Sequence, residues 1–270
     1  MIIPFVKAHG AGNDFLYTFL SELEAAPSAA DIPGLARSIC HRHTGPGADG
    51  WYLIEHPVEG ADARIRLWNS DGSSAALSGN GTRCAAAILL ERGLAPETVR
   101  LLTGAGLKRA CLIRRDGRIL WFEMEMGTPR IEPGDLRYAL PLRDGPRDVT
   151  IVDVGNPQCA VVVDSLDFDW VSLGAEIERH PRFPHHTNVS FLCRVDDHTV
   201  EARFFERGAG HTLSSGTGAT GAAAAALLLG LVQNPVTVRT EFCPIEVRWS
   251  DGPMHLTGPA EVIAQGQFYL

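Results

Sequence analysis

One pattern occurs twice in this chain and limits the folds open to it. Residues 68–90 and 205–232 each contain a polar loop, a Ser-Gly-X-Gly step and then an Ala-rich segment with apolar residues on every face. A helix that is apolar all round is buried on all sides. The two steps begin at Ser78 and Ser215, about half of the 270 residues apart. The sequence therefore predicts two similar halves, each burying one such helix, with the active site between them.

The composition favours a small molecule as the binding partner. The chain has a formal net charge of -8 and no basic run, whereas binding to phosphates requires clustered Lys and Arg. We therefore expect neither nucleic acid nor a membrane as partner. The segment 218–232 is too short and too rich in Ala and Gly to span a bilayer, and it is interpreted as a core helix.

The cysteines indicate a reducing compartment. No CxxC spacing and no signal peptide accompany them, so free thiols in the cytoplasm are expected. The cysteines are Cys40, Cys84, Cys111, Cys159, Cys193 and Cys243.

Strands are expected to surround both central helices, and short helices are expected at 35–43 and 171–178. The predicted domains are residues 1–120, joined by the tail 262–270, and residues 121–261. The predicted strands are 2–8, 64–68, 99–103, 108–114, 119–126, 150–154, 159–163, 199–205, 236–241 and 245–249.

The repeated step suggests a chemistry. A helix N-terminus offers unpaired N–H groups and about half a positive charge, and glycines let an anion approach the backbone. Two such ends in one cleft would hold one carboxylate and stabilise the charge that develops when a neighbouring proton is removed, which is the hard step in racemising an amino acid. Ser78 and Ser215 would then lie on opposite faces of the α-carbon, as two-base proton transfer requires. The alternative is that both serines only cap their helices.

Two other functions, dinucleotide binding and zinc binding, are less well supported by the sequence. Residues 216–221 match the dinucleotide fingerprint GxGxxG and Glu241 follows about twenty residues later, but residues 206–215 separate the motif from its strand. Residues 45–50 match the same letters but are predicted to enter a strand, not to open a helix. A third pattern, a set of histidines without HxxxH spacing, favours a surface loop over zinc. These histidines are His41, His43, His180, His185 and His186.

Six motifs carry a family resemblance. In chain order they are HGAGNDF, RHTGPGADG, NSDGSSAALSGNGTRCAA, GNPQC, HPRFPHHTNVSF and FERGAGHTLSSGTGATGAA. Together they closely resemble the diaminopimelate epimerase family along nearly the whole chain. The resemblance implies an α+β fold of two pseudo-symmetric domains, each a mostly antiparallel sheet wrapped around a central helix, with the active site in the cleft between them. It also implies an isomerase without cofactor or metal, which converts LL- to meso-diaminopimelate for lysine and peptidoglycan synthesis.

The resemblance also implies site residues. The backbone amides of Gly79, Asn80, Gly216 and Thr217 match the positions that cradle the carboxylate. The side chains that match substrate-binding positions are Asn13, Asn69, Asn156, Asn188, Glu206 and Arg207.

The chain departs from the family pattern at its most important positions. The two catalytic residues of the family are cysteines, and here they are Ser78 and Ser215. If Ser ionises roughly five units above Cys, the penalty is about 7 kcal/mol. The family's NPH ends here in Gln158, and its GAGET has His211 in place of Glu. Both could modulate the site, and His211, four residues before Ser215, is the candidate base that would assist a serine.

Three interpretations follow from these departures. The chain is an active epimerase with assisted serines, an inactive or ligand-trapping relative that binds carboxylates, or an isomerase of the wider superfamily with another substrate. Because the residues for distal recognition are retained, the third interpretation is the weakest. Diaminopimelate is the predicted ligand, and homodimerisation stays open.

Overall fold

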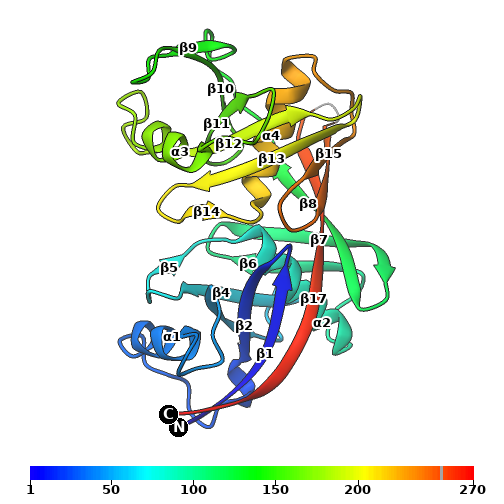
Figure 1. Ribbon diagram of the computed structural model, residues 1–270. Coiled ribbons are helices and arrows are strands. Elements are labelled where there is room, and N and C mark those ends of the chain that lie inside the picture. The colour runs from blue at the N-terminus through cyan, green and yellow to red at the C-terminus, as the bar shows by residue number, and fades with distance from the viewer. Residues whose placement is uncertain (250–251) are drawn as a thin grey trace. The chain divides into compact units, whose positions relative to one another are not determined.

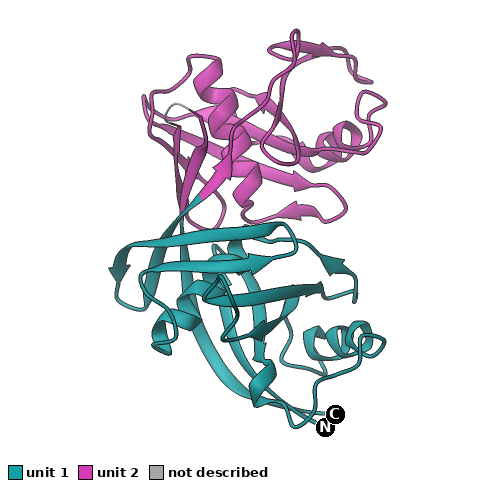
Figure 2. Cartoon of the chain, turned by 180° about the vertical axis from the view of Figure 1, so that it is seen from behind, with its two compact units in different colours: residues 1–124, 258–270 teal, residues 125–257 magenta. Residues whose placement is uncertain are grey.

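The computed structural model describes residues 1–249 and 252–270, and these residues form two compact units (Figure 2). Unit 1 contains residues 1–124 and 258–270, and unit 2 contains residues 125–257. The boundaries fall inside two strands, β8 (Ile119–Gly127) and β17 (Met254–Tyr269), so each of these strands contributes residues to both units.

Unit 1 holds both chain termini. β17 pairs antiparallel with β1 from Ile2 opposite Tyr269, and the N-terminal ammonium donates to the Leu270 carbonyl at 3.2 Å (Figure 1). The remaining elements of this unit are β1 (Ile2–Gly10), β2 (Asn13–Phe19), η1 (Leu20–Glu22), α1 (Ile32–Cys40), β3 (Gly50–Glu55), β4 (Ala63–Asn69), β5 (Ser74–Ala75), α2 (Gly79–Glu91), β6 (Thr98–Thr103) and β7 (Gly106–Asp116).

Unit 2 is built on the same plan. Its elements are β9 (Tyr138–Leu140), β10 (Arg147–Asp153), β11 (Pro157–Val162), α3 (Trp170–Glu178), β12 (Asn188–Arg194), β13 (Thr199–Glu206), β14 (Gly210–Thr212), α4 (Gly216–Leu228), β15 (Val236–Arg239) and β16 (Pro244–Trp249).

The strand pairing shows that the chain contains one topology twice. In unit 1, β1 pairs antiparallel with β2, β2 parallel with β3, β3 and β5 antiparallel with β4, and β4 parallel with β6. In unit 2, β10 to β15 repeat this series of antiparallel and parallel pairs in the same order. The helices also correspond, because α1 and α3 each precede the third strand, and α2 and α4 each follow the fifth.

Each unit wraps its strands around one central helix. α2 packs on β1, β2, β6 and β7, and α4 packs on β10 to β13, β15 and β16. Small residues let the strands approach these helices closely. A Cβ atom at Gly81 would lie 2.4 Å from Tyr52 Oη, and one at Gly218 would lie 2.7 Å from Phe204 Cδ1. The second glycine of each Ser-Gly-X-Gly step is therefore required by packing.

The α+β class with mostly antiparallel sheets around two central helices is confirmed. All ten predicted strands and both short helices exist, with ends shifted by a few residues. Six strands were not predicted: β2, β5, β9, β12, β14 and β17. β2 and β12 were missed because most of their residues are buried and their side chains show no polar–apolar alternation. In the described residues, none of the helices has the length and apolar character that a membrane span needs.

Candidate active site

The first Ser-Gly-X-Gly step forms the N-terminus of α2. Ser78 is the N-cap in extended backbone conformation, and its Oγ accepts a hydrogen bond from the amide of Gly81 at 3.2 Å. The cap therefore satisfies the third amide of the helix. The first two amides, those of Gly79 and Asn80, have no acceptor within the helix, so they remain available to an anion.

The second step has the same local geometry at the N-terminus of α4. Ser215 is the N-cap, and its Oγ accepts from the amide of Gly218 at 3.1 Å. This arrangement again leaves two amides without an acceptor in the helix, here those of Gly216 and Thr217. Both serines are thus caps, and capping itself leaves free the amides that were predicted to bind a carboxylate.

A carboxylate lies against Ser215. The Ser215 hydroxyl donates to Glu206 Oε2 at 2.8 Å, and the Thr212 hydroxyl donates to Glu206 Oε1 at 2.7 Å. Burial raises the pKa of Glu206 by more than these two hydrogen bonds lower it. Glu206 is therefore a proton acceptor of increased basicity that directly contacts the Ser215 hydroxyl.

The structure corrects the prediction for His211. In the β13–β14 hairpin His211 lies opposite Phe205, whereas Thr212 lies opposite Phe204, so Thr212 and Glu206 share the other face. The His211 ring has other partners, with Nε2 2.6 Å from Glu241 Oε2 and a T-shaped ring contact with Trp170. The side chain that accepts the Ser215 hydroxyl is consequently Glu206 and not His211.

Gln158 and Asn156 form a polar chain that leads to α4. Gln158 is fully buried, and its Nε2 donates to Asn156 Oδ1 at 2.7 Å. Asn156 Nδ2 donates to Thr217 Oγ1 at 3.2 Å. Gln158 thus fixes a predicted substrate-binding side chain next to the free amides of α4.

Asn188 and Arg207 lie close together in unit 2. Asn188 is buried and uses both ends of its amide, because Nδ2 donates to the Pro157 carbonyl and Oδ1 accepts from the Arg207 amide. The Arg207 guanidinium is exposed and donates to the His185 carbonyl at 3.1 Å. Asn188 therefore positions the backbone at Arg207, whose side chain is exposed.

Asn13 and Asn69 lie at one edge of the unit 1 sheet. Asn13 begins β2, Gly50 begins β3 and pairs with both Phe15 and Asn69, and Asn69 ends β4. Asn69 Nδ2 donates to Ser73 Oγ at 3.0 Å, and Asn13 Nδ2 donates to Asp49 Oδ2 at 2.5 Å. Asn13 and Asn69 therefore lie at the same end of the strands β2, β3 and β4.

Sequence reasoning missed Arg83. This arginine is fully buried in α2, and its Nη2 donates to Asn80 Oδ1 at 2.5 Å while its Nε donates to the Pro259 carbonyl. It holds a residue of the predicted cradle against β17. The available signal was a charged residue within an otherwise apolar helix, because such a side chain is rarely buried without a specific partner.

The cysteines that the chain does contain do not offer a replacement thiolate in the core. All six are free. Burial raises the pKa of Cys40 and Cys84 to about 12 and also raises that of Cys159. A thiol must ionise to act as a base or nucleophile, so these three buried residues are structural.

Comparison with known proteins identifies the family. The family model described as diaminopimelate epimerase matches residues 5–132 and 150–263. The diaminopimelate epimerase of Moorella thermoacetica is 39% identical over 280 residues, which cover 98% of this chain and 99% of that protein.

Two solved structures share the fold. One is a phenazine biosynthesis protein of the PhzF family from Bacillus anthracis, with a TM-score of 0.74, 15% identity and coverage of 100% of both chains. The other is a probable proline racemase from Agrobacterium radiobacter K84 with bound carbonate, with a TM-score of 0.73, 19% identity and coverage of 99% of this chain and 93% of that chain. Because the family model and the relative both match along most of the chain, this protein belongs to the diaminopimelate epimerase family and is an isomerase of the epimerase type.

Proposed function

We propose that this chain converts LL-diaminopimelate to meso-diaminopimelate without a cofactor, by proton transfer at the α-carbon, with Ser78 and Ser215 at the two catalytic positions of the family. The observation that carries the proposal is the contact of Ser215 Oγ with Glu206 Oε2 at 2.8 Å. It supplies the assistance that a serine needs, because a hydroxyl is a weak base or nucleophile without an adjacent proton acceptor.

The proton transfer can be written through this pair. The Cα–H bond of the substrate breaks and its proton moves to Ser215 Oγ, while the proton of the Ser215 hydroxyl moves to Glu206 Oε2. The electron pair left on Cα spreads into the adjacent carboxylate, where preorganised N–H donors stabilise the developing charge. The free amides of Gly79, Asn80, Gly216 and Thr217 are proposed as those donors. The proposal requires Ser78 to lie on the opposite face of Cα and to deliver a proton there.

The environment of Ser78 favours a second candidate function. Among the described residues, no carboxylate lies within hydrogen-bond distance of Ser78 Oγ, which accepts the Gly81 amide and lies near the buried Tyr52 hydroxyl. A serine without such a partner is a poor proton carrier. The second candidate is therefore a relative that binds diaminopimelate through its carboxylates and does not turn it over.

Proton NMR in heavy water separates the two functions. We expect the α-proton signal of LL-diaminopimelate to disappear in the presence of the protein, because either proton transfer or full epimerisation exchanges this proton for deuterium. Heat-denatured protein serves as the control. If the signal persists although calorimetry shows binding, the chain is a binding protein and the proposed turnover is wrong.

Arg207 is proposed to hold the distal carboxylate, while Glu206 and the asparagines receive amino groups. A planar guanidinium can grip a carboxylate with two parallel hydrogen bonds. Arg207→Ala is therefore expected to weaken binding of diaminopimelate by at least about 2 kcal/mol, as for a lost hydrogen bond to a charged group, as measured by calorimetry.

Arg194→Ala is the matched control for this change. Like Arg207, Arg194 is a partly exposed arginine of unit 2 that donates to a backbone carbonyl, here that of Leu231, but it does not match a substrate position. Unchanged affinity is expected for this variant. Equal affinities for both variants would remove Arg207 from the site and would favour a different substrate.

The cysteines support a cytoplasmic setting within this proposal. All six thiols are free, and three are buried with raised pKa values, so none of these three is readily oxidised or paired. A reducing compartment is where such a set of thiols persists.

A further inference from the structure

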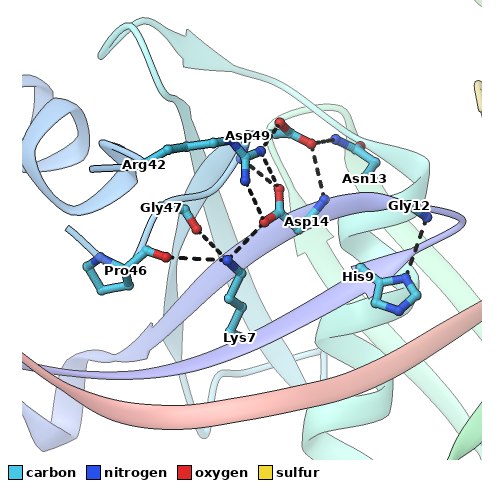
Figure 3. A network of polar contacts seen from close by, with 9 residues as sticks. All are labelled: Lys7, His9, Gly12, Asn13, Asp14, Arg42, Pro46, Gly47 and Asp49. Atoms are coloured by element: carbon cyan, nitrogen blue, oxygen red, sulfur yellow. Dashed lines mark hydrogen bonds and ion pairs between the residues drawn. The ribbon is translucent and has the colours of Figure 1, made fainter. Parts of the chain in front are cut away.

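The orientation of the Asn13 carboxamide is fixed by a carboxylate. Asn13 Nδ2 lies 2.5 Å from Asp49 Oδ2, and the same oxygen accepts the backbone amide of Asp14 at 3.1 Å (Figure 3). An amide can meet an ionised carboxylate only with its NH₂ group, because the carboxylate has no proton to donate. Asn13 Oδ1 therefore points away from Asp49, and the structure records no partner for it among the described residues.

Asp49 is itself held in a balanced network of charges. Arg42 Nη2 lies 2.7 Å from Asp49 Oδ1 and 2.8 Å from Asp14 Oδ1, and Lys7 Nζ lies 3.0 Å from Asp14 Oδ2. Two cations thus face two carboxylates. Burial alone would raise the pKa of Asp14, but hydrogen bonds from Arg42 and Lys7 outweigh it and lower the pKa.

The loop 45–50, whose GPGADG sequence resembles a nucleotide fingerprint, is part of this network. Lys7 Nζ donates to the Gly47 carbonyl at 2.6 Å and to the Pro46 carbonyl at 3.3 Å, and Figure 3 shows these two carbonyls of one loop facing the Lys7 ammonium of β1. The loop then delivers Asp49 at the start of β3. Its conformation thus serves to place a carboxylate beside Asn13.

The repeated topology offers an internal comparison. Asn13 is the first residue of β2 after its turn from β1, and Asn156 is the last residue of the corresponding turn between β10 and β11. Asn156 Oδ1 is occupied by Gln158, and its Nδ2 donates to Thr217. The two asparagines therefore differ in their hydrogen bonding. Of this pair, only Asn13 has a side-chain oxygen without a hydrogen-bond partner among the described residues.

We propose that Asp49 is a positioning residue, which turns the Asn13 carboxamide so that Oδ1 accepts a hydrogen bond from an amino group of the substrate. This inference rests on the proposed function for the contact between Asn13 and diaminopimelate. Beyond the proposed function, the inference states that Asn13 recognises a cationic N–H donor and that Asp49 fixes the orientation of Asn13 that this recognition needs.

The test is Asp49→Asn, with two ligands. An asparagine at position 49 can present either N–H or C=O to Asn13, so the orientation of Asn13 is no longer imposed. We expect calorimetry to show about tenfold weaker binding of diaminopimelate, consistent with impairment of one hydrogen bond to a charged group. For pimelate, the same dicarboxylate without amino groups, we expect a change of less than about twofold, because no N–H donor is present to lose.

The matched control is Asp62→Asn. The carboxylate of Asp62 also accepts a backbone amide and an arginine, both from Arg100, but it does not contact an asparagine. Binding of both ligands should be unchanged in this variant. Should Asp49→Asn weaken pimelate as much as diaminopimelate, or weaken neither, Asp49 has only a structural role and the inference is overturned.

Two further measurements keep the inference open to test if Asp49→Asn unfolds. Asn13→Ala should show the same selective loss of diaminopimelate with Asp49 intact. The ¹⁵N-resolved signals of the Asn13 NH₂ group should shift between the wild-type chain and Asp49→Asn, and identical signals would overturn the orientation itself. If the wild-type chain binds neither ligand, the proposed function and the role of Oδ1 both fail, whereas the NH₂ signals still report the orientation.

Discussion

Replacing both serines by cysteine, Ser78→Cys together with Ser215→Cys, is expected to raise the rate of diaminopimelate epimerisation at least about a hundredfold. Both positions are N-caps of long helices, and a helix N-terminus lowers the pKa of a thiol. A thiol keeps the size of the side chain while it supplies a group that can ionise near neutral pH. The measurement is the loss of the α-proton of LL-diaminopimelate in heavy water.

The single replacements should do much less than the double replacement. An epimerase needs a base on one face of the α-carbon and an acid on the other, and residues that act as one unit have strongly non-additive effects. A double variant that is slower than the starting protein would show that serine works here with its own base, in which case Glu206 becomes essential. If the double variant binds diaminopimelate and remains inactive, the departure from the family pattern at Gln158 becomes the next candidate cause of the inactivity.

The repeat was predictable from the sequence because the features that define it, helix caps and apolar helix faces, depend on residues close together in the chain. The Ser-Gly-X-Gly steps identify the capped N-termini of two helices. Both helices are Ala-rich with apolar residues on every face, which identifies them as central helices. Strands with one exposed face, such as β4, show alternating burial and were predicted. Strands that are buried on both faces, such as β2 and β12, have no such alternation, and a short apolar run alone does not distinguish a strand from other buried structure.

The partner of Ser215 could not be read from spacing alone. His211 is nearer in sequence than Glu206, but the hairpin turn between β13 and β14 places Glu206 and Thr212 on one face and His211 on the other. The side of a hairpin on which a residue lies depends on the strand register, and a shift of one residue exchanges the two faces. The same limitation applies to Asp49, whose contact with Asn13 depends on the parallel pairing of β2 with β3.

Glu206→Gln should strongly slow the proton exchange proposed for the unmodified chain. Glutamine keeps the shape of the side chain and can still accept the Ser215 hydrogen bond through its carbonyl oxygen, but it cannot take the proton. General acid–base catalysis contributes typically about 10² to 10⁴ in rate, so a loss of at least about a hundredfold is expected. In the variant with cysteine at positions 78 and 215, the same change should cost less, because the thiol can ionise at the helix N-terminus without this base.

The pH dependence provides a second signature of Glu206. Burial raises its pKa above the ordinary value of 4.5, and only the ionised form can accept a proton, so the exchange rate should rise as pH rises through this raised pKa. The Glu206→Gln variant should lack this rise.

Stability shows whether a loss of activity reflects chemistry or unfolding. Since the pKa of Glu206 is higher in the folded state than in the unfolded chain, the folded state binds this proton more tightly. Its contribution to stability is complete below the ordinary value near 4.5 and is lost as pH rises through the raised pKa. Glutamine is always neutral, so the melting temperature of Glu206→Gln at pH 8 should be no lower than that of the unmodified chain. A variant that is folded, binds diaminopimelate and exchanges the α-proton at the original rate would show that Glu206 is not the base.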